Sequence, residues 1–266
     1  TISITGVDAA GNTGSATETV DFDFTAPSLL STSLSTTLAG LGDEIVYTLN
    51  TSETLSNTPT PEVSGLTFTL ETGTTFTFRH VVTAADANGN YSAVFDLVDG
   101  VGNRRDNVSD GKTFAVDATV PTISNMAFAG GRTRYSRVAG FSTITLTFNL
   151  SENVGAGLVV TADGRAMTCN AYQAAAPNHT CTYVVAAVDT EGVKSIAVGA
   201  EDVAGNRSDA SQTVTYDLTA PTLLSTSLST TLAGLGEEIV YTLNASETLS
   251  NTPTPEVTGL TFTLET

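Results

Sequence analysis

One stretch of sequence occurs twice in this chain: APSLLSTSLSTTLAGLGDEIVYTLNTSETLSNTPTPEVSGLTFTLET at residues 26–72, and APTLLSTSLSTTLAGLGEEIVYTLNASETLSNTPTPEVTGLTFTLET at residues 220–266. Four positions differ, all of them mildly: Ser28/Thr222, Asp43/Glu237, Thr51/Ala245 and Ser64/Thr258. The offset is 194 residues, and the same offset places residues 1–25 on residues 195–219. Near-identity of this extent indicates a recent duplication and predicts an array of repeated modules.

Two short phrases punctuate the chain in a fixed order. An acidic Gly-Asn phrase is followed each time by an acidic Thr-Pro phrase: VDAAGN and DFTAP, VDGVGN and DATVP, EDVAGN and DLTAP. They divide the repeat unit into two different modules. The predicted segments are the C-terminal part of one module (1–24), a type A module (25–117), a type B module (118–217) and the N-terminal half of a second type A module (218–266).

Each module is predicted to consist of β-strands. Residues 44–50 alternate Ile45, Tyr47 and Leu49 with polar neighbours, and residues 143–150 (TITLTFNL) alternate in the same way. Gly, Asn, Asp or Pro separates further short runs of period two, and helical periodicity is absent. Short strands in units of about 100 residues favour a seven-strand sandwich. The expected fold class is all-β: tandem seven-strand immunoglobulin-like β-sandwiches arranged as an extended rod.

The composition argues against several classes of function. The chain has 10 Lys and Arg against 28 Asp and Glu, a net charge of −18. That charge argues against binding to nucleic acid or to an anionic membrane. No apolar run reaches the about 18 residues that a membrane-spanning helix needs. HExxH, GxSxG and Walker motifs are all missing, so we expect a protein that is not an enzyme.

The sequence contains two cysteines, Cys169 and Cys181. Their spacing fits neither a redox CxxC motif nor a four-cysteine zinc site. One interpretation is a disulfide that joins neighbouring strands, which would place the protein outside the reducing cytosol. The other is a pair of free buried thiols.

The order of these signals resembles a known family. A VDxxGN phrase, a strand, a DxTxP phrase and then a strand ending in Ser-Glu are similar to the bacterial immunoglobulin-like repeats of large surface adhesins. The resemblance covers essentially the whole chain. It implies a non-catalytic stalk of an adhesin or filament at the bacterial cell surface, with neighbouring modules and laterally packed copies as partners. Alternatives are modules that bind carbohydrate or protein, and accessory modules of a secreted polysaccharide-degrading enzyme.

The sandwich topology predicts that three carboxylates of each module meet at the linker where the module begins. They come from the linker, from the end of the second strand and from the Gly-Asn loop. The candidates are Asp23, Glu53 and Asp99 in the first whole module, Asp117, Glu152 and Asp202 in the second, Asp217 and Glu247 in the last, and Asp8 in the N-terminal part. The third member of the last set would lie beyond Thr266.

Uncompensated carboxylates repel one another and raise their pKa values, whereas Ca²⁺ accepts six to eight oxygen ligands, including carboxylates. The residues therefore suggest a structural Ca²⁺ at each junction, and the resemblance to the adhesin repeats implies the same. The alternative is turn chemistry alone, in which the Gly permits a positive φ and the Asn tolerates a left-handed backbone and bonds locally.

Two weaker motifs have an open interpretation. Residues 86–91 (DANGNY) and 189–194 (DTEGVK) are expected at the far end of each module. They either form turns or help to complete the next junction. The one basic cluster, GGRTRYSR at residues 130–137, is either a solvated loop or a contact for an acidic face of another copy.

Overall fold

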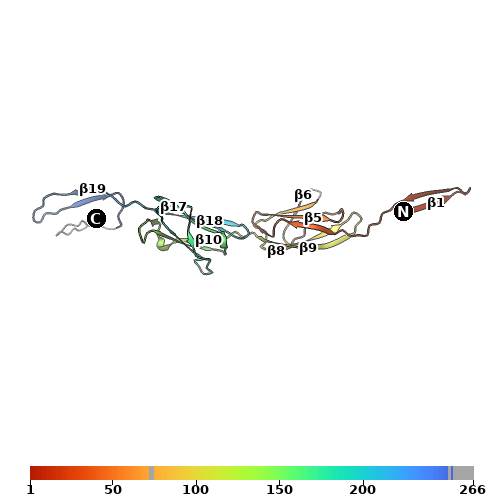
Figure 1. Ribbon diagram of the computed structural model, residues 1–266, viewed down its shortest axis with the longest axis horizontal. Helices are drawn as coiled ribbons and strands as arrows, with labels where there is room; N and C mark the ends of the chain where they lie inside the picture. Colours follow the sequence, from red (N-terminus) through yellow and green to blue (C-terminus); the bar gives the residue numbers. More distant parts are fainter. Residues whose placement is uncertain (72–74, 251–252, 254–266) are drawn as a thin grey trace.

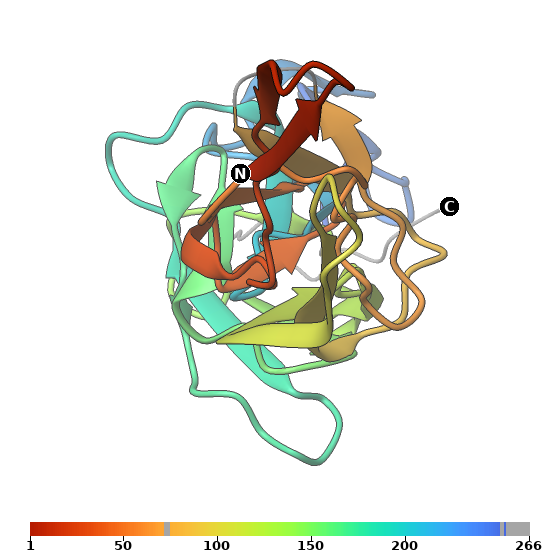
Figure 2. The ribbon, with the colours of Figure 1, turned by 90° about the vertical axis from the view of Figure 1, so that its right-hand side faces the viewer.

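The computed structural model describes residues 1–71, 75–250 and 253. Strands dominate these residues, and the two helices among them are single 3-10 turns, η1 (Ala129–Gly131) and η2 (Gly155–Gly157). No helix in the described ranges is long and apolar enough to cross a membrane. The units follow one another along an extended rod (Figure 1), and Figure 2 looks along that rod from its N-terminal end. The expected all-β class and the extended arrangement of sandwiches are confirmed.

The first complete sandwich consists of a four-stranded sheet in the order β3-β5-β7-β6 and a three-stranded sheet in the order β4-β9-β8. Its strands are β3 (Leu29–Leu34), β4 (Leu38–Gly40), β5 (Glu44–Thr51), β6 (Thr69–Glu71), β7 (Phe76–Val81), β8 (Gly89–Val98) and β9 (Arg104–Asp117). Strand β4 pairs with β9 in parallel, while β5 lies antiparallel between β3 and β7. The long β8–β9 hairpin therefore closes one face of the sandwich and ends at the linker to the next.

The second sandwich repeats this plan with a four-stranded sheet, β10-β12-β16-β15, and a five-stranded sheet, β11-β18-β17-β13-β14. Its strands are β10 (Ile123–Phe128), β11 (Arg134–Tyr135), β12 (Thr143–Leu150), β13 (Leu158–Ala162), β14 (Arg165–Ala166), β15 (Thr168–Cys169), β16 (His179–Val184), β17 (Gly192–Glu201) and β18 (Arg207–Tyr216). As in the first sandwich, a short strand, β11, pairs in parallel with the last long strand, β18.

A two-stranded hairpin lies at each end of the rod. The N-terminal hairpin pairs β1 (Ile2–Val7) with β2 (Thr13–Glu18), and the C-terminal one pairs β19 (Leu223–Leu228) with β20 (Tyr241–Ala245). Both hairpins expose residues that the whole sandwiches bury: Ile4 is 69% exposed, whereas Val198, at the same place in the 194-residue repeat, is 1% exposed.

Each whole sandwich has one core between its two sheets. In the first core, Ile45, Tyr47 and Leu49 of β5 are fully buried against Phe95 of β8. In the second, alternate residues of β12 are buried in the same way. Each such side chain stabilises the fold by roughly 1.5–3 kcal/mol. The alternation predicted for residues 44–50 and 143–150 therefore marks the core face of the second strand in both sandwiches.

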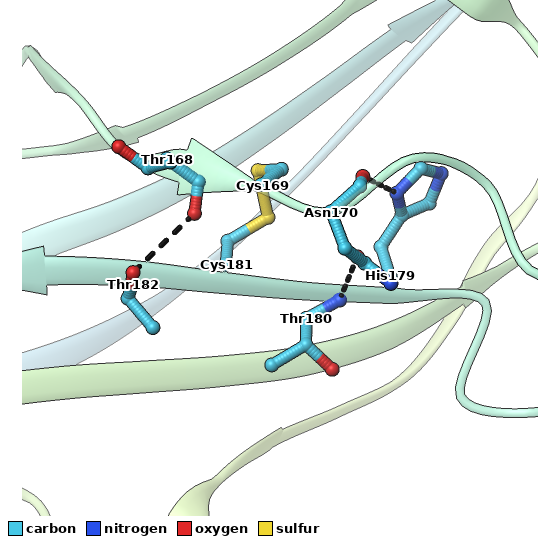
Figure 3. The surroundings of a disulfide bond; sticks show 7 residues. All are labelled: Thr168, Cys169, Asn170, His179, Thr180, Cys181 and Thr182. Carbon is cyan, nitrogen blue, oxygen red and sulfur yellow. Dashed lines mark hydrogen bonds between the residues drawn. A yellow bond between two sulfur atoms is a disulfide. The ribbon is translucent and has the colours of Figure 1, made fainter.

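The two cysteines form a disulfide between adjacent strands of the second sandwich (Figure 3). Cys169 of β15 lies directly opposite Cys181 of β16. Beside it, the Thr180 backbone N–H donates to Asn170 Oδ1 at 2.6 Å, and Thr182 Oγ1 lies 3.5 Å from the Thr168 carbonyl. The predicted disulfide across neighbouring strands is confirmed, and it fastens a two-residue strand to the edge of its sheet.

Candidate metal centre

Two groups of three carboxylates converge, one at the start of each whole sandwich. In each group, one carboxylate oxygen from every residue lies within 4.8 Å of the others. The groups are Asp23, Glu53 and Asp99, and Asp117, Glu152 and Asp202. Calcium binds oxygen at about 2.3–2.6 Å, so two oxygens on one ion are at most about 5 Å apart. The spacing in both groups fits a single ion.

The three carboxylates of each group come from three separate segments of the chain. In the first group, Asp23 precedes β3, Glu53 follows the end of β5, and Asp99 lies in the turn between β8 and β9. In the second group, the equivalent segments precede β10, follow β12 and join β17 to β18. The structure therefore brings together the six residues that the sandwich topology was expected to bring together.

The other three candidates lie outside these groups. Asp8 is exposed in the β1–β2 turn, where its Oδ1 accepts the N–H of Ala10 and that of Asn12, both at 2.9 Å. Asp217 and Glu247 both lie among the described residues. Among the described residues, none of these three belongs to a group of three potential ligands.

The aspartate of the Gly-Asn loop is held by its own turn. Asp99 Oδ1 accepts backbone N–H groups of Val101, Gly102 and Asn103 at 2.7–2.9 Å, and its Oδ2 accepts Asn103 Nδ2 at 2.7 Å. Burial acts to raise the pKa of Asp99, but these bonds outweigh it, and the pKa lies below its ordinary value. The turn thus keeps a buried carboxylate ionised.

The pKa of the glutamate in each group is shifted in the opposite direction. Burial raises the pKa of Glu53, and the negative charges of Asp23 and Asp99 raise it further. The pKa of Glu152 is raised in the same way, by burial and then by its neighbours Asp202 and Asp117. Across the described ranges, no ion pair involves any of the six carboxylates. Each group is a concentration of negative charge that a cation would neutralise.

The asparagine of the loop has a role that the sequence reasoning missed. Asn103 Nδ2 donates to the carbonyl oxygen of Asp23 at 3.1 Å, and Asn206 Nδ2 donates to that of Asp117 at 2.8 Å. The side chain therefore ties the loop to the linker. The positive φ belongs to the glycine instead, 96° at Gly102 and 87° at Gly205. The signal was present in the sequence, because the Asn recurs in all three phrases.

The far-end motifs form turns, and parts of them also reach the next linker. Asp86 bonds to His80 and Thr83 within its own sandwich. Asn88, two residues on, donates from Nδ2 to Asp117 Oδ1 at 2.7 Å. In the second sandwich, Thr219 Oγ1 of the following linker donates to Glu191. The loop between β7 and β8, and its counterpart before β17, thus approaches the next junction.

No protein-family model and no curated protein matches this sequence. Solved structures do match. Fibronectin(III)-like modules of Clostridium thermocellum CbhA are 18% identical, with 71% of this chain and 94% of that chain covered and a TM-score of 0.35. A Ca²⁺-stabilized adhesin of an Antarctic bacterium is 22% identical, with 83% and 58% covered and a TM-score of 0.41. Extracellular domains 3–5 of Drosophila OTK are 14% identical, with 80% and 68% covered and a TM-score of 0.35. At TM-scores below 0.5 these likenesses say nothing about function, which has to be inferred from the residues of this chain.

Proposed function

We propose that this chain is a non-catalytic segment of the stalk of an extracellular bacterial adhesin or surface filament, stiffened by Ca²⁺ at its module junctions. One observation carries the proposal: the same three-carboxylate group stands at the start of both whole sandwiches. An isolated acidic cluster has many explanations, but an identical cluster at successive junctions of a rod indicates a role in joining modules.

The position of each group explains how an ion would act. Asp117 is the last residue of β9, where the linker begins, while Glu152 and Asp202 belong to the second sandwich. An ion bound to all three would fix the linker to the sandwich and restrict rotation at the junction. Calcium suits this task because it takes oxygen ligands in a flexible geometry. Its binding would also relieve the repulsion that raises the pKa of Glu152.

Two further features support an extracellular spacer. The disulfide between Cys169 and Cys181 is typical of proteins that mature in an oxidising compartment. The near-identity of residues 26–72 and 220–266 suits a part whose task is length, since loops that bind different ligands would diverge between copies. Neighbouring modules are then the principal partners, and other copies of the rod packed laterally are the second kind of partner.

The test is calcium titration of the whole chain by calorimetry, together with small-angle scattering in millimolar Ca²⁺ and in chelator. We expect two binding sites and a shorter, more flexible particle after chelation. Asp117→Asn should remove one site. Asp8→Asn is the matched control. Asp8 lies in the same kind of turn as Asp202 but belongs to no three-carboxylate group. Two sites that survive Asp117→Asn, or a particle that chelation leaves unchanged, would reject the proposal.

A further inference from the structure

We infer that the first sandwich docks directly onto the β17–β18 turn of the second, through a contact that needs glycine at position 40 and does not depend on a metal ion. The surface is formed by the end of β4 and by the loop between β7 and β8. The end of β4 meets the Val-Ala-Gly-Asn turn (residues 203–206) of the following type B module, and the loop meets the linker between the two sandwiches. This inference goes beyond calcium stiffening, because it assigns a protein contact at the junction.

The closest approach is at Gly40. A Cβ added there would lie 2.2 Å from the carbonyl oxygen of Ala204, a residue of the next sandwich, and 3.0 Å from Asn206 Oδ1. The φ of Gly40 lies outside the left-handed region, so its own backbone does not require glycine. The residue is buried, and the atom in its way is backbone, which cannot swing aside as a flexible side chain can. Glycine at this position therefore serves the contact between modules.

A hydrogen bond beside Gly40 fixes how the two modules are oriented at the contact. The backbone N–H of Leu41 donates to Asn206 Oδ1 at 2.6 Å. Asn206 is 4% exposed and uses its Nδ2 for Asp117 O and Asp202 Oδ2, both at 2.8 Å. One side chain thus joins the preceding sandwich, the linker and its own turn.

A second loop of the first sandwich holds the linker itself. Asn88 Nδ2 donates to Asp117 Oδ1 at 2.7 Å and to Thr119 Oγ1 at 2.8 Å. Asn88 Oδ1 accepts the backbone N–H of Ala118 at 2.8 Å. The linker is therefore fixed on its N-terminal side by the first sandwich, and all of these bonds form between protein groups.

The equivalent turn at the preceding junction shows that docking is separable from the carboxylate group. Asn103 makes the same bonds from Nδ2, to Asp23 O and Asp99 Oδ2, and the group of Asp23, Glu53 and Asp99 still forms. Asn103 is only half-buried. Each carboxylate group needs only the linker and the sandwich that follows it. The contact at Gly40 needs both sandwiches.

The second sandwich presents a different surface to whatever follows it. Strand register places Ser136 where the first sandwich has Gly40, because Tyr135 pairs with Tyr216 as Ala39 pairs with Val116. Glu191 stands where the first sandwich has Asn88. The surface that accepts the Val-Ala-Gly-Asn turn is therefore a property of the type A module, and it sets which module can follow it in this geometry.

The experiment introduces Gly40→Ala into the whole chain and compares it with Gly234→Ala. Gly234 is the same residue in the repeated stretch, and a Cβ there meets nothing closer than Glu237 Oε2 at 3.7 Å. Two readouts are made in chelator: hydrogen exchange of the Leu41 amide, and the distribution of distances between spin labels on the two sandwiches. We expect exchange to accelerate about tenfold and the distribution to broaden for Gly40→Ala alone.

A second variant, Asn88→Ala, guards against misfolding, because Asn88 is exposed and lies outside the core. It should broaden the distribution while the melting of both sandwiches stays unchanged. If Gly40→Ala and Asn88→Ala leave the distance distribution as it is in the parent chain, the docking contact is refuted. That result is distinct from a failure of the calcium proposal, which would appear as a missing response to Ca²⁺ in the parent chain.

Discussion

The two copies of the repeated stretch share a sequence but differ in their surroundings. In the first copy, β3 and β5 pair from Leu29 opposite Thr51, with a bulge before Ser31. In the second, β19 and β20 pair from Leu223 opposite Ala245, with a bulge before Ser225, 194 residues further on in each case. The hairpin and its irregularity are thus specified by the stretch itself.

What the two copies do not share is burial. Tyr47 is fully buried, whereas Tyr241, its equivalent, is 37% exposed. Strand β4 has no counterpart among the described residues of the second copy. In the first copy, β8 and β9 supply the partner for β4 and the opposite wall of the core. The comparison separates the local contribution to this fold from the contribution of strands far along the chain.

The largest expected difference between the copies is in the stability lost when an equivalent leucine is shortened to alanine. Leu49→Ala should lower the free energy of unfolding of the first sandwich by about 2–5 kcal/mol, because Leu49 is fully buried. Leu243→Ala, at the equivalent half-buried position, should lower the free energy of unfolding by less than Leu49→Ala does. Urea denaturation of the whole chain measures both. Equal effects would mean that the second copy is packed as tightly as the first.

A smaller difference is expected in calcium binding. Glu53 belongs to a carboxylate group, whereas Glu247, its equivalent, does not within the described residues. Glu53→Gln should weaken calcium at the first junction at least about tenfold, which corresponds to about 1.4 kcal/mol. Glu247→Gln should leave both measured sites unchanged. Calorimetry measures calcium binding by both variants. A loss of calcium binding caused by Glu247→Gln alone would reverse the assignment.

The raised pKa of Glu53 predicts a pH dependence. Because folding raises the pKa of Glu53 above its ordinary value of 4.5, the metal-free folded chain holds this proton more tightly than the unfolded chain does. Without metal, the fold therefore gains stability as the pH falls through the raised pKa. Calcium needs the deprotonated form, so its affinity should fall about twofold at that pH. Titrations from neutral pH downward measure the change, and an affinity that stays constant to pH 4.5 would contradict it.

The smallest effect concerns a position at which the copies differ naturally. Asp43 Oδ2 accepts the N–H of Gly40 at 2.9 Å, and Glu237 Oε2 accepts that of Gly234 at 2.6 Å. Asp43→Glu should therefore change the free energy of unfolding by less than about 0.5 kcal/mol. Thermal melting is sufficient to test this. A loss well above that figure would show that the shorter side chain also serves the junction at Gly40.

Much of the fold could be predicted from the sequence because its signals are local. The alternation at Ile45, Tyr47 and Leu49 marks the buried face of β5, and the carboxylate groups follow from which loops share one end of a sandwich. The disulfide was one of two open interpretations, since spacing alone does not show that Cys169 faces Cys181. The approach of residues 86–91 to the next junction was one of two open interpretations. The contact at Gly40 could not be predicted, because it depends on how two modules meet.

The alternation of module types also bears on how the chain folds as it is made. Synthesis completes β8 and β9 at residue 117, about 100 residues before the second copy begins at residue 220. At about 5–20 residues per second, this gives the first hairpin a lead of roughly 5–20 s in which to capture its own partner strands. Adjacent identical modules would compete for the same strands. A dissimilar module between them delays the synthesis of the second copy, so that each copy pairs with the strands of its own module.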